Sequence, residues 1–159
     1  MTSHEPSRTE LVREFFTMAL YIALSLLAVT LVAPTTGDGW HAAGAMLLTA
    51  LGLVLAHLLA FAMSSRLVSG GQPDLAGARL LGVQAVAGAA VALLATLPVL
   101  VLPNPLGVQV AGVMLFVIIG VVGFWAARNG GASVMRSLGY VAIVAVLVCA
   151  VLAVKTLVH

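Results

Sequence analysis

The chain has 159 residues, of which 62% are hydrophobic and only 8% are charged. A soluble domain carries roughly 25% charged residues, so these charges are too few to cover a surface exposed to water. The composition therefore excludes an ordinary soluble domain and indicates that lipid is the main solvent. The seven basic residues are spread along the whole chain and form no patch, so we expect no binding to nucleic acid.

Five segments are long and apolar enough to cross a bilayer as helices, which requires about 20 residues. The third and fourth segments are separated only by Pro103–Pro105, a sequence typical of a tight turn. The sequence thus predicts an all-α membrane protein, a five-transmembrane-helix bundle. Residues 1–14 are expected to form a cytoplasmic tail and the start of helix one, and residues 15–159 a single transmembrane domain. The predicted spans are residues 15–33, 42–63, 80–102, 106–127 and 138–158.

The arginine residues predict the orientation of the chain. All six lie in the N-terminal tail or in the links after the second and fourth spans, whereas the links after the first and third spans contain no Arg or Lys. Because cytoplasmic loops are enriched in these residues, we expect the N-terminus in the cytoplasm and the C-terminus outside, in a bacterial cytoplasmic membrane. The Arg residues expected at the inner face of the spans are Arg13, Arg66, Arg79, Arg128 and Arg136.

The first helix is expected to begin before its apolar segment. Ser7 and Glu10 have the spacing of a capping box, in which each side chain accepts a hydrogen bond from the other residue's backbone N–H. Glu14 follows one turn later and is adjacent to Arg13. We expect these two residues to form an ion pair at the membrane surface.

Two stretches of the chain resemble each other. RLLGVQAVA at Arg79–Ala87 and RSLGYVAIV at Arg136–Val144 share Arg, Leu, Gly and Ala at the same positions, and similar features precede both in the same order. This pattern is typical of one helix followed by two parallel-repeat helical hairpins. The alternative is a chance likeness between segments rich in Ala, Leu, Val and Gly, and both interpretations stay open. The repeat aligns Gly120 and Val141 with His57 and Gln84.

Small residues recur along several spans. Such residues allow helix backbones to approach closely in lipid, so we expect them at helix–helix contacts. The second span has Gly52, Ala56 and Ala60 at steps of four. The other small residues considered are Ala78, Gly82, Ala85, Gly88, Ala89 and Ala92 in and just before the third span, and Gly112, Gly120 and Gly123 in the fourth.

Three polar side chains within the spans form a candidate intramembrane polar site. Tyr21, His57 and Gln84 are predicted at nearly one depth in the cytoplasmic half of the bilayer. Because a neutral imidazole and an amide each offer donors and acceptors, we expect a hydrogen bond between His57 and Gln84. Two interpretations remain open: the pair either binds two helices together or contacts a solute or a proton.

The chain resembles small, uncharacterised integral membrane proteins of high-GC bacteria of the actinobacterial type. Its most distinctive portion is REFFTMALYIALSLLAV at Arg13–Val29. The resemblance implies no particular activity, ligand or partner.

The sequence has no nucleophile motif, phosphate-binding loop or cluster of metal ligands, so we expect neither an enzyme nor a cofactor. Short loops and abundant small residues favour an accessory or assembly protein that acts by helix–helix packing. Its expected partners are the lipid bilayer and either a second copy of the chain or another membrane protein. The alternative is a small oligomeric permease or channel that uses Tyr21, His57 and Gln84. The absence of a carboxylate from the predicted spans argues against that alternative.

Overall fold

The structure of the protein is a computed structural model, and nearly all of it is helical. The residues that it describes are 6–32, 39–69, 75–129, 131, 133–139, 141–143, 145–146 and 150. Within these ranges the chain forms helices joined by short turns, with no β-strand. The all-α prediction is therefore confirmed for this part of the chain.

Among the described residues, four helices are long and apolar enough to cross a membrane, and they match the first four predicted spans. Their bounds are α1 Arg8–Val32, α2 Gly39–Ser69, α3 Leu75–Val101 and α4 Leu106–Asn129. The break between α3 and α4 falls at the predicted proline turn. Most of the fifth predicted span, residues 138–158, lies outside the described residues. Residues 138–139 and 141–143 of it are helical.

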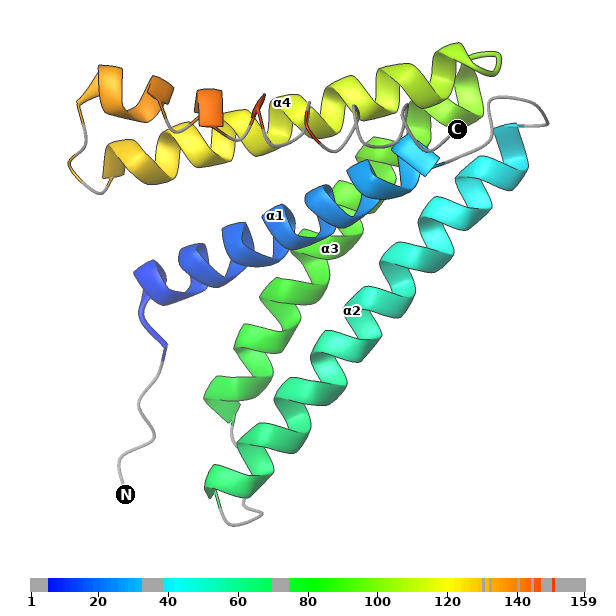
Figure 1. The fold of residues 1–159 in the computed structure, drawn as a ribbon. Helices are drawn as coiled ribbons and strands as arrows, with labels where there is room; N and C mark the ends of the chain where they lie inside the picture. Colours follow the sequence, from blue (N-terminus) through cyan, green and yellow to red (C-terminus); the bar gives the residue numbers. More distant parts are fainter. Residues whose placement is uncertain are drawn as a thin grey trace. The chain divides into compact units, whose positions relative to one another are not determined.

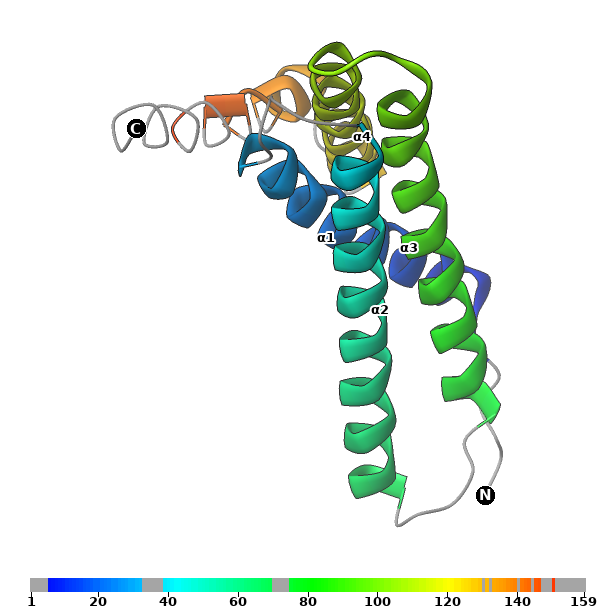
Figure 2. The ribbon, with the colours of Figure 1, turned by 90° about the vertical axis from the view of Figure 1, so that its right-hand side faces the viewer.

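The chain divides into two compact units, Met1–Leu115 and Phe116–His159, and the boundary falls within α4. In the first unit, α2 and α3 run antiparallel beside each other, and α1 crosses α3 obliquely in the same general direction (Figures 1 and 2). The beginnings of α1 and α3 and the end of α2 thus lie toward one end of this unit.

The contact between α1 and α3 joins large side chains to small ones. On α1 the fully buried residues include Met18, Ile22 and Leu26, which recur every four residues and so form one helical face. On α3 the buried face consists largely of small residues, among them Gly88 and Ala92. A Cβ at Gly88 would lie 2.6 Å from a methyl group of Val54, 3.5 Å from Ile22 and 3.8 Å from Met18. Gly88 therefore lies where α1, α2 and α3 meet.

Helix α2 is covered only near its beginning. A Cβ at Gly39 would lie 2.6 Å from the backbone oxygen of Val99, which shows how closely α2 begins against α3. Its buried residues are Ala42, Ala43, Met46 and Ala50, and none of its later described residues is buried.

The predicted use of small residues is therefore only partly correct. Gly88 and Ala92 pack as expected, but Gly52, Ala56 and Ala60 are exposed, and a Cβ at Gly52 would have no neighbour within 4 Å. Spacing in the sequence identifies a helical face without indicating which neighbour covers it. Of the remaining residues of the set, Ala78, Gly82 and Ala89 are also exposed, whereas Ala85, Gly112, Gly120 and Gly123 are half-buried.

The turn from α3 into α4 brings the two backbones together at Gly107. A Cβ at this position would lie 2.7 Å from the Pro98 oxygen and 2.9 Å from the Val99 Cα. No side chain fits there without a shift of the backbone. In the second unit, a Cβ at Gly120 would lie 3.7 Å from Val141, an ordinary van der Waals contact.

Candidate functional site

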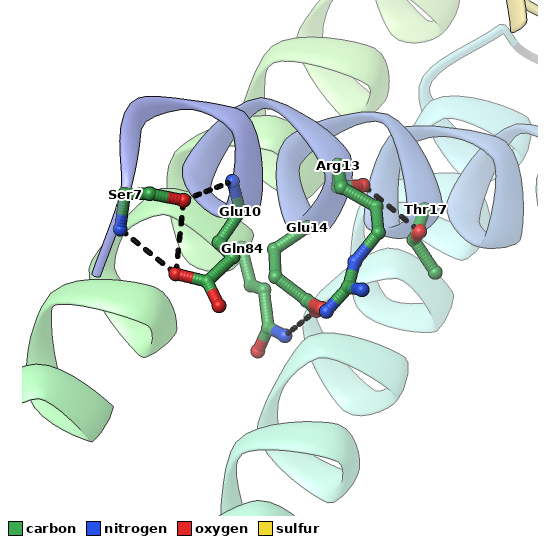
Figure 3. Close-up of polar contacts among 6 residues, drawn as sticks. All are labelled: Ser7, Glu10, Arg13, Glu14, Thr17 and Gln84. Atoms are coloured by element: carbon green, nitrogen blue, oxygen red, sulfur yellow. Dashed lines mark hydrogen bonds and ion pairs between the residues drawn. The ribbon is translucent and has the colours of Figure 1, made fainter. Parts of the chain in front are cut away.

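The first turn of α1 is fixed by the predicted capping box. Glu10 N–H donates to the Ser7 hydroxyl at 3.3 Å, and Ser7 N–H donates to the Glu10 carboxylate at 2.8 Å (Figure 3). The helix therefore begins at Arg8, several residues before its apolar segment. As a result, Glu14 lies in the second turn of a formed helix and at a fixed place on its surface.

Glu14 contacts Gln84 of α3 across the helix interface. The Gln84 side-chain amide donates through Nε2 to Oε2 of Glu14 at 2.8 Å (Figure 3). Gln84 is 2% exposed, whereas the Glu14 side chain is 23% exposed. A hydrogen bond to a carboxylate is stronger than one between neutral groups. This pair thus anchors the beginning of α1 to α3.

The same amide has an unused acceptor. Its Oε1 is buried and accepts no hydrogen bond from the described part of the chain. Most buried polar side-chain atoms in proteins have at least one partner, so this oxygen is an exception that needs an explanation.

Arg13 supplies the second contact of Glu14. One of its guanidinium nitrogens lies 3.2 Å from Oε1 of Glu14, so the predicted ion pair is confirmed. The Arg13 side chain is 71% exposed, and water therefore weakens the attraction. Glu14 is held by a buried amide on one side and by a solvated cation on the other.

Tyr21 and His57 form a separate aromatic contact between α1 and α2. Their ring centroids lie 6.3 Å apart, with a tilt of 39° between the ring planes. Tyr21 is 44% exposed and His57 is half-buried. The contact lies seven residues beyond Glu14 on α1, or about 10 Å along the helix axis.

The predicted hydrogen bond between Gln84 and His57 is wrong. Gln84 instead donates to Glu14, and His57 contacts Tyr21. The prediction placed the first span at its apolar boundary and so left Glu14 outside it. Because α1 crosses α3, Glu14, one residue before the predicted span, is the residue that reaches the Gln84 amide. One signal was available in the sequence, since Glu14, Met18 and Tyr21 are spaced to lie on one helical face.

The five arginines expected at the inner face are all exposed, and Arg13 is in the second turn of α1. Arg66 is in the last turn of α2, and Arg79 is in the second turn of α3. Arg128 is in the last turn of α4, and Arg136 follows in the second unit.

The described residues include no group of three His, Cys, Asp or Glu side chains that could hold a metal ion. The carboxylate, amide, phenol and imidazole groups of the first unit are suited to form hydrogen bonds. No protein-family model, curated protein or solved structure matches the chain.

Proposed function

We propose that this protein is a multi-pass protein of the bacterial cytoplasmic membrane and serves as a non-catalytic accessory or assembly protein. In this proposal it acts by packing α2 against another membrane protein or a second copy of itself. The observation that carries the proposal is the exposure of α2. Only 11% of its most apolar stretch is buried, against 39% for α1 and for α3.

The exposed part of α2 has the composition of a helix-packing surface. Gly52, Ala56 and Ala60 follow one another at steps of four and all are exposed. In lipid, where apolar contact alone gives no drive to associate, small residues let two helices approach closely enough for van der Waals contact. Large apolar side chains such as Leu55 and Leu59 are exposed beside them and would pack around a second helix.

Purification in a mild detergent tests this function. A membrane protein recovered in fixed stoichiometry, or a defined homo-oligomer, would support a packing role. We expect Ala56→Leu to abolish the association because it fills the small-residue surface of α2. The matched control is Ala89→Leu, which adds the same side chain to an exposed position of α3 and should leave the association intact. A monomer without partners in native lipid would contradict the proposal.

The proposed membrane arrangement has five spans, with the N-terminus in the cytoplasm and the C-terminus outside. Arg13 is near the beginning of α1, Arg66 near the end of α2 and Arg79 near the beginning of α3. These helix ends lie toward one end of the first unit (Figure 1), which supports this orientation. Cys149 is the one cysteine in the chain, so Cys149→Ala provides a background for labelling single cysteines placed near each terminus. Labelling of both termini from the same side would exclude five spans.

The proposed arrangement extends to a repeat of two hairpins. The likeness in sequence between Arg79–Ala87 and Arg136–Val144 supports it. The aligned positions differ in their contacts, since a Cβ at Gly120 would lie beside Val141, whereas His57 contacts Tyr21 and Gln84 contacts Glu14. Cysteine cross-links between α4 and residues 138–158 test whether the second hairpin forms along its length.

A small oligomeric permease or channel is the second candidate function. It is favoured by the polar groups that the first unit brings between its helices, now including the Glu14 carboxylate as well as Tyr21, His57 and Gln84. Intramembrane polar residues often mark a pathway. Liposomes containing the purified protein would show a solute or ion flux that His57→Ala removes if this candidate is correct.

A further inference from the structure

The contact between Glu14 and Gln84 leaves one hydrogen-bond acceptor unused. Nε2 of the amide donates to Glu14, while the buried Oε1 receives no hydrogen bond from any residue that the structure describes. A buried polar oxygen without a partner is unfavourable, and any donor delivered to it would be bound. The interface between α1 and α3 thus lacks a hydrogen-bond donor for Oε1 of Gln84.

The interface admits only a very small ligand. Oε1 of Gln84 is sealed from the outside. One turn further along α3, the space around Gly88 is already filled by Val54, Ile22 and Met18. A hydrated metal ion or an organic molecule would have to separate the helices. A proton added to the neighbouring carboxylate supplies a donor without adding a heavy atom.

We infer that Glu14 and Gln84 form a proton-binding site between α1 and α3. A proton taken from water binds the Glu14 carboxylate and gives a carboxylic acid. The new O–H donates to Oε1 of Gln84, and the carbonyl oxygen of the acid still accepts from Nε2. An acid and a primary amide each present one donor and one acceptor side by side, so they close a ring of two hydrogen bonds.

Closing this ring requires the Gln84 amide to turn so that Oε1 as well as Nε2 faces Glu14. The torsion at the amide of Gln has a broad energy profile, so this rotation is easy. Proton uptake thus turns one hydrogen bond into two and leaves no acceptor unused on that edge of the amide. The site thus couples protonation of Glu14 to the hydrogen bonding between α1 and α3.

The charged and titratable side chains of α1, α2 and α3 differ in their effect on the Glu14 carboxylate. On α1, Arg13 stabilises the ionised carboxylate, and Glu10 lies one turn earlier. On α3, Arg79 lies five residues before Gln84, and α2 contributes His57 and Arg66. Arg13 is largely solvated, whereas the amide is buried, so water screens the first interaction and not the second.

Protons have access to the site from water. The Glu14 side chain is 23% exposed, and it lies near the end of the first unit at which α1 begins. The inference does not depend on the proposed packing function, since it involves no residue of the exposed α2 face.

Infrared difference spectra of the full chain in liposomes, recorded between acidic and neutral pH, test the inference. We expect a carboxylic acid C=O band that disappears in Glu14→Gln and shifts in Gln84→Met, which removes the amide and keeps an unbranched side chain of similar length. Glu10→Gln is the control and should leave this band unchanged. A Glu14 band that is insensitive to Gln84→Met would overturn the inference, as would the absence of any Glu14 band.

A second measurement avoids substitution at Gln84. The chain contains three glutamines, so Gln72→Ala with Gln109→Ala leaves Gln84 as the sole side-chain amide of that type. With ¹⁵N-labelled glutamine in detergent, we expect its NH₂ resonances to change with pH and to become independent of pH when Glu14→Gln is added. Resonances that do not change with pH, or that keep their pH dependence in Glu14→Gln, would refute the site.

Discussion

The amide of Gln84 on α3 donates a 2.8 Å hydrogen bond to the carboxylate of Glu14 on α1, although the two residues are 70 positions apart in the sequence. The hydroxyls of Thr17, Ser25, Thr30 and Thr96, in contrast, bond to carbonyls of their own helices. The Gln84 bond therefore links two helices, whereas those hydroxyl bonds satisfy side chains locally.

We predict that Gln84→Met destabilises the fold by about 1 kcal/mol, the order measured for side-chain hydrogen bonds between helices in membranes. The variant leaves the Glu14 carboxylate without its buried donor. Thermal unfolding in detergent measures the change. Gln109→Met, at an exposed position of α4, is the control and should have no effect. Equal stability of the two variants would show that the contact contributes nothing.

The helices themselves could be predicted because long apolar segments and a capping box are local signals. Ser7 and Glu10 set the start of α1, and Pro103–Pro105 separates α3 from α4, each without reference to a distant residue. The partner of Gln84 could not be predicted in this way. It depends on how α1 crosses α3, and that geometry follows from which side chains interlock.

The small residues show the same limit. From the sequence alone, Gly52 and Gly88 cannot be distinguished, since both occur in rows of small residues on apolar helices. Gly88 is buried at the meeting point of three helices, and Gly52 is exposed. The difference arises because α1 covers α3 and leaves most of α2 exposed. The spacing of residues within α2 cannot predict which neighbouring helix will cover it.

We predict that Gly88→Ala destabilises the first unit by about 1–3 kcal/mol, the usual result of overpacking a filled interior. The added Cβ would lie 2.6 Å from Cγ2 of Val54. A β-branched side chain has few rotamers into which it could move, so the helices must separate slightly. Unfolding in detergent, followed by circular dichroism, gives the difference in stability.

Two further variants isolate the cause. Gly82→Ala on the same helix meets no atom within 4 Å, so it should be neutral or stabilising by up to about 1 kcal/mol through helix propensity. Val54→Ala combined with Gly88→Ala should recover part of the lost stability, since it removes the clashing methyl group. Additive losses in the double variant would place the clash elsewhere.

We predict that Gly107→Ala is more damaging, at about 3 kcal/mol, the upper part of the range for overpacking. Its Cβ would meet backbone atoms, the Pro98 oxygen at 2.7 Å and the Val99 Cα at 2.9 Å, and a backbone cannot rotate away as a side chain does. Gly44→Ala, which has no neighbour within 4 Å, is the matched control. A Gly107→Ala variant as stable as the control would contradict the close approach of α3 and α4.

The last prediction concerns the start of α1. Ser7→Ala removes the hydroxyl that accepts from Glu10 N–H, and loss of such a cap costs about 0.5–2 kcal/mol. We expect faster hydrogen exchange at the amides of Glu10 and Leu11, which bond to Ser7. We expect little change at Glu14, because Gln84 holds the second turn independently. Adding Gln84→Met should extend the fast exchange to Glu14. If Ser7→Ala alone exposes Glu14 to fast exchange, the contact with Gln84 is too weak to anchor the helix.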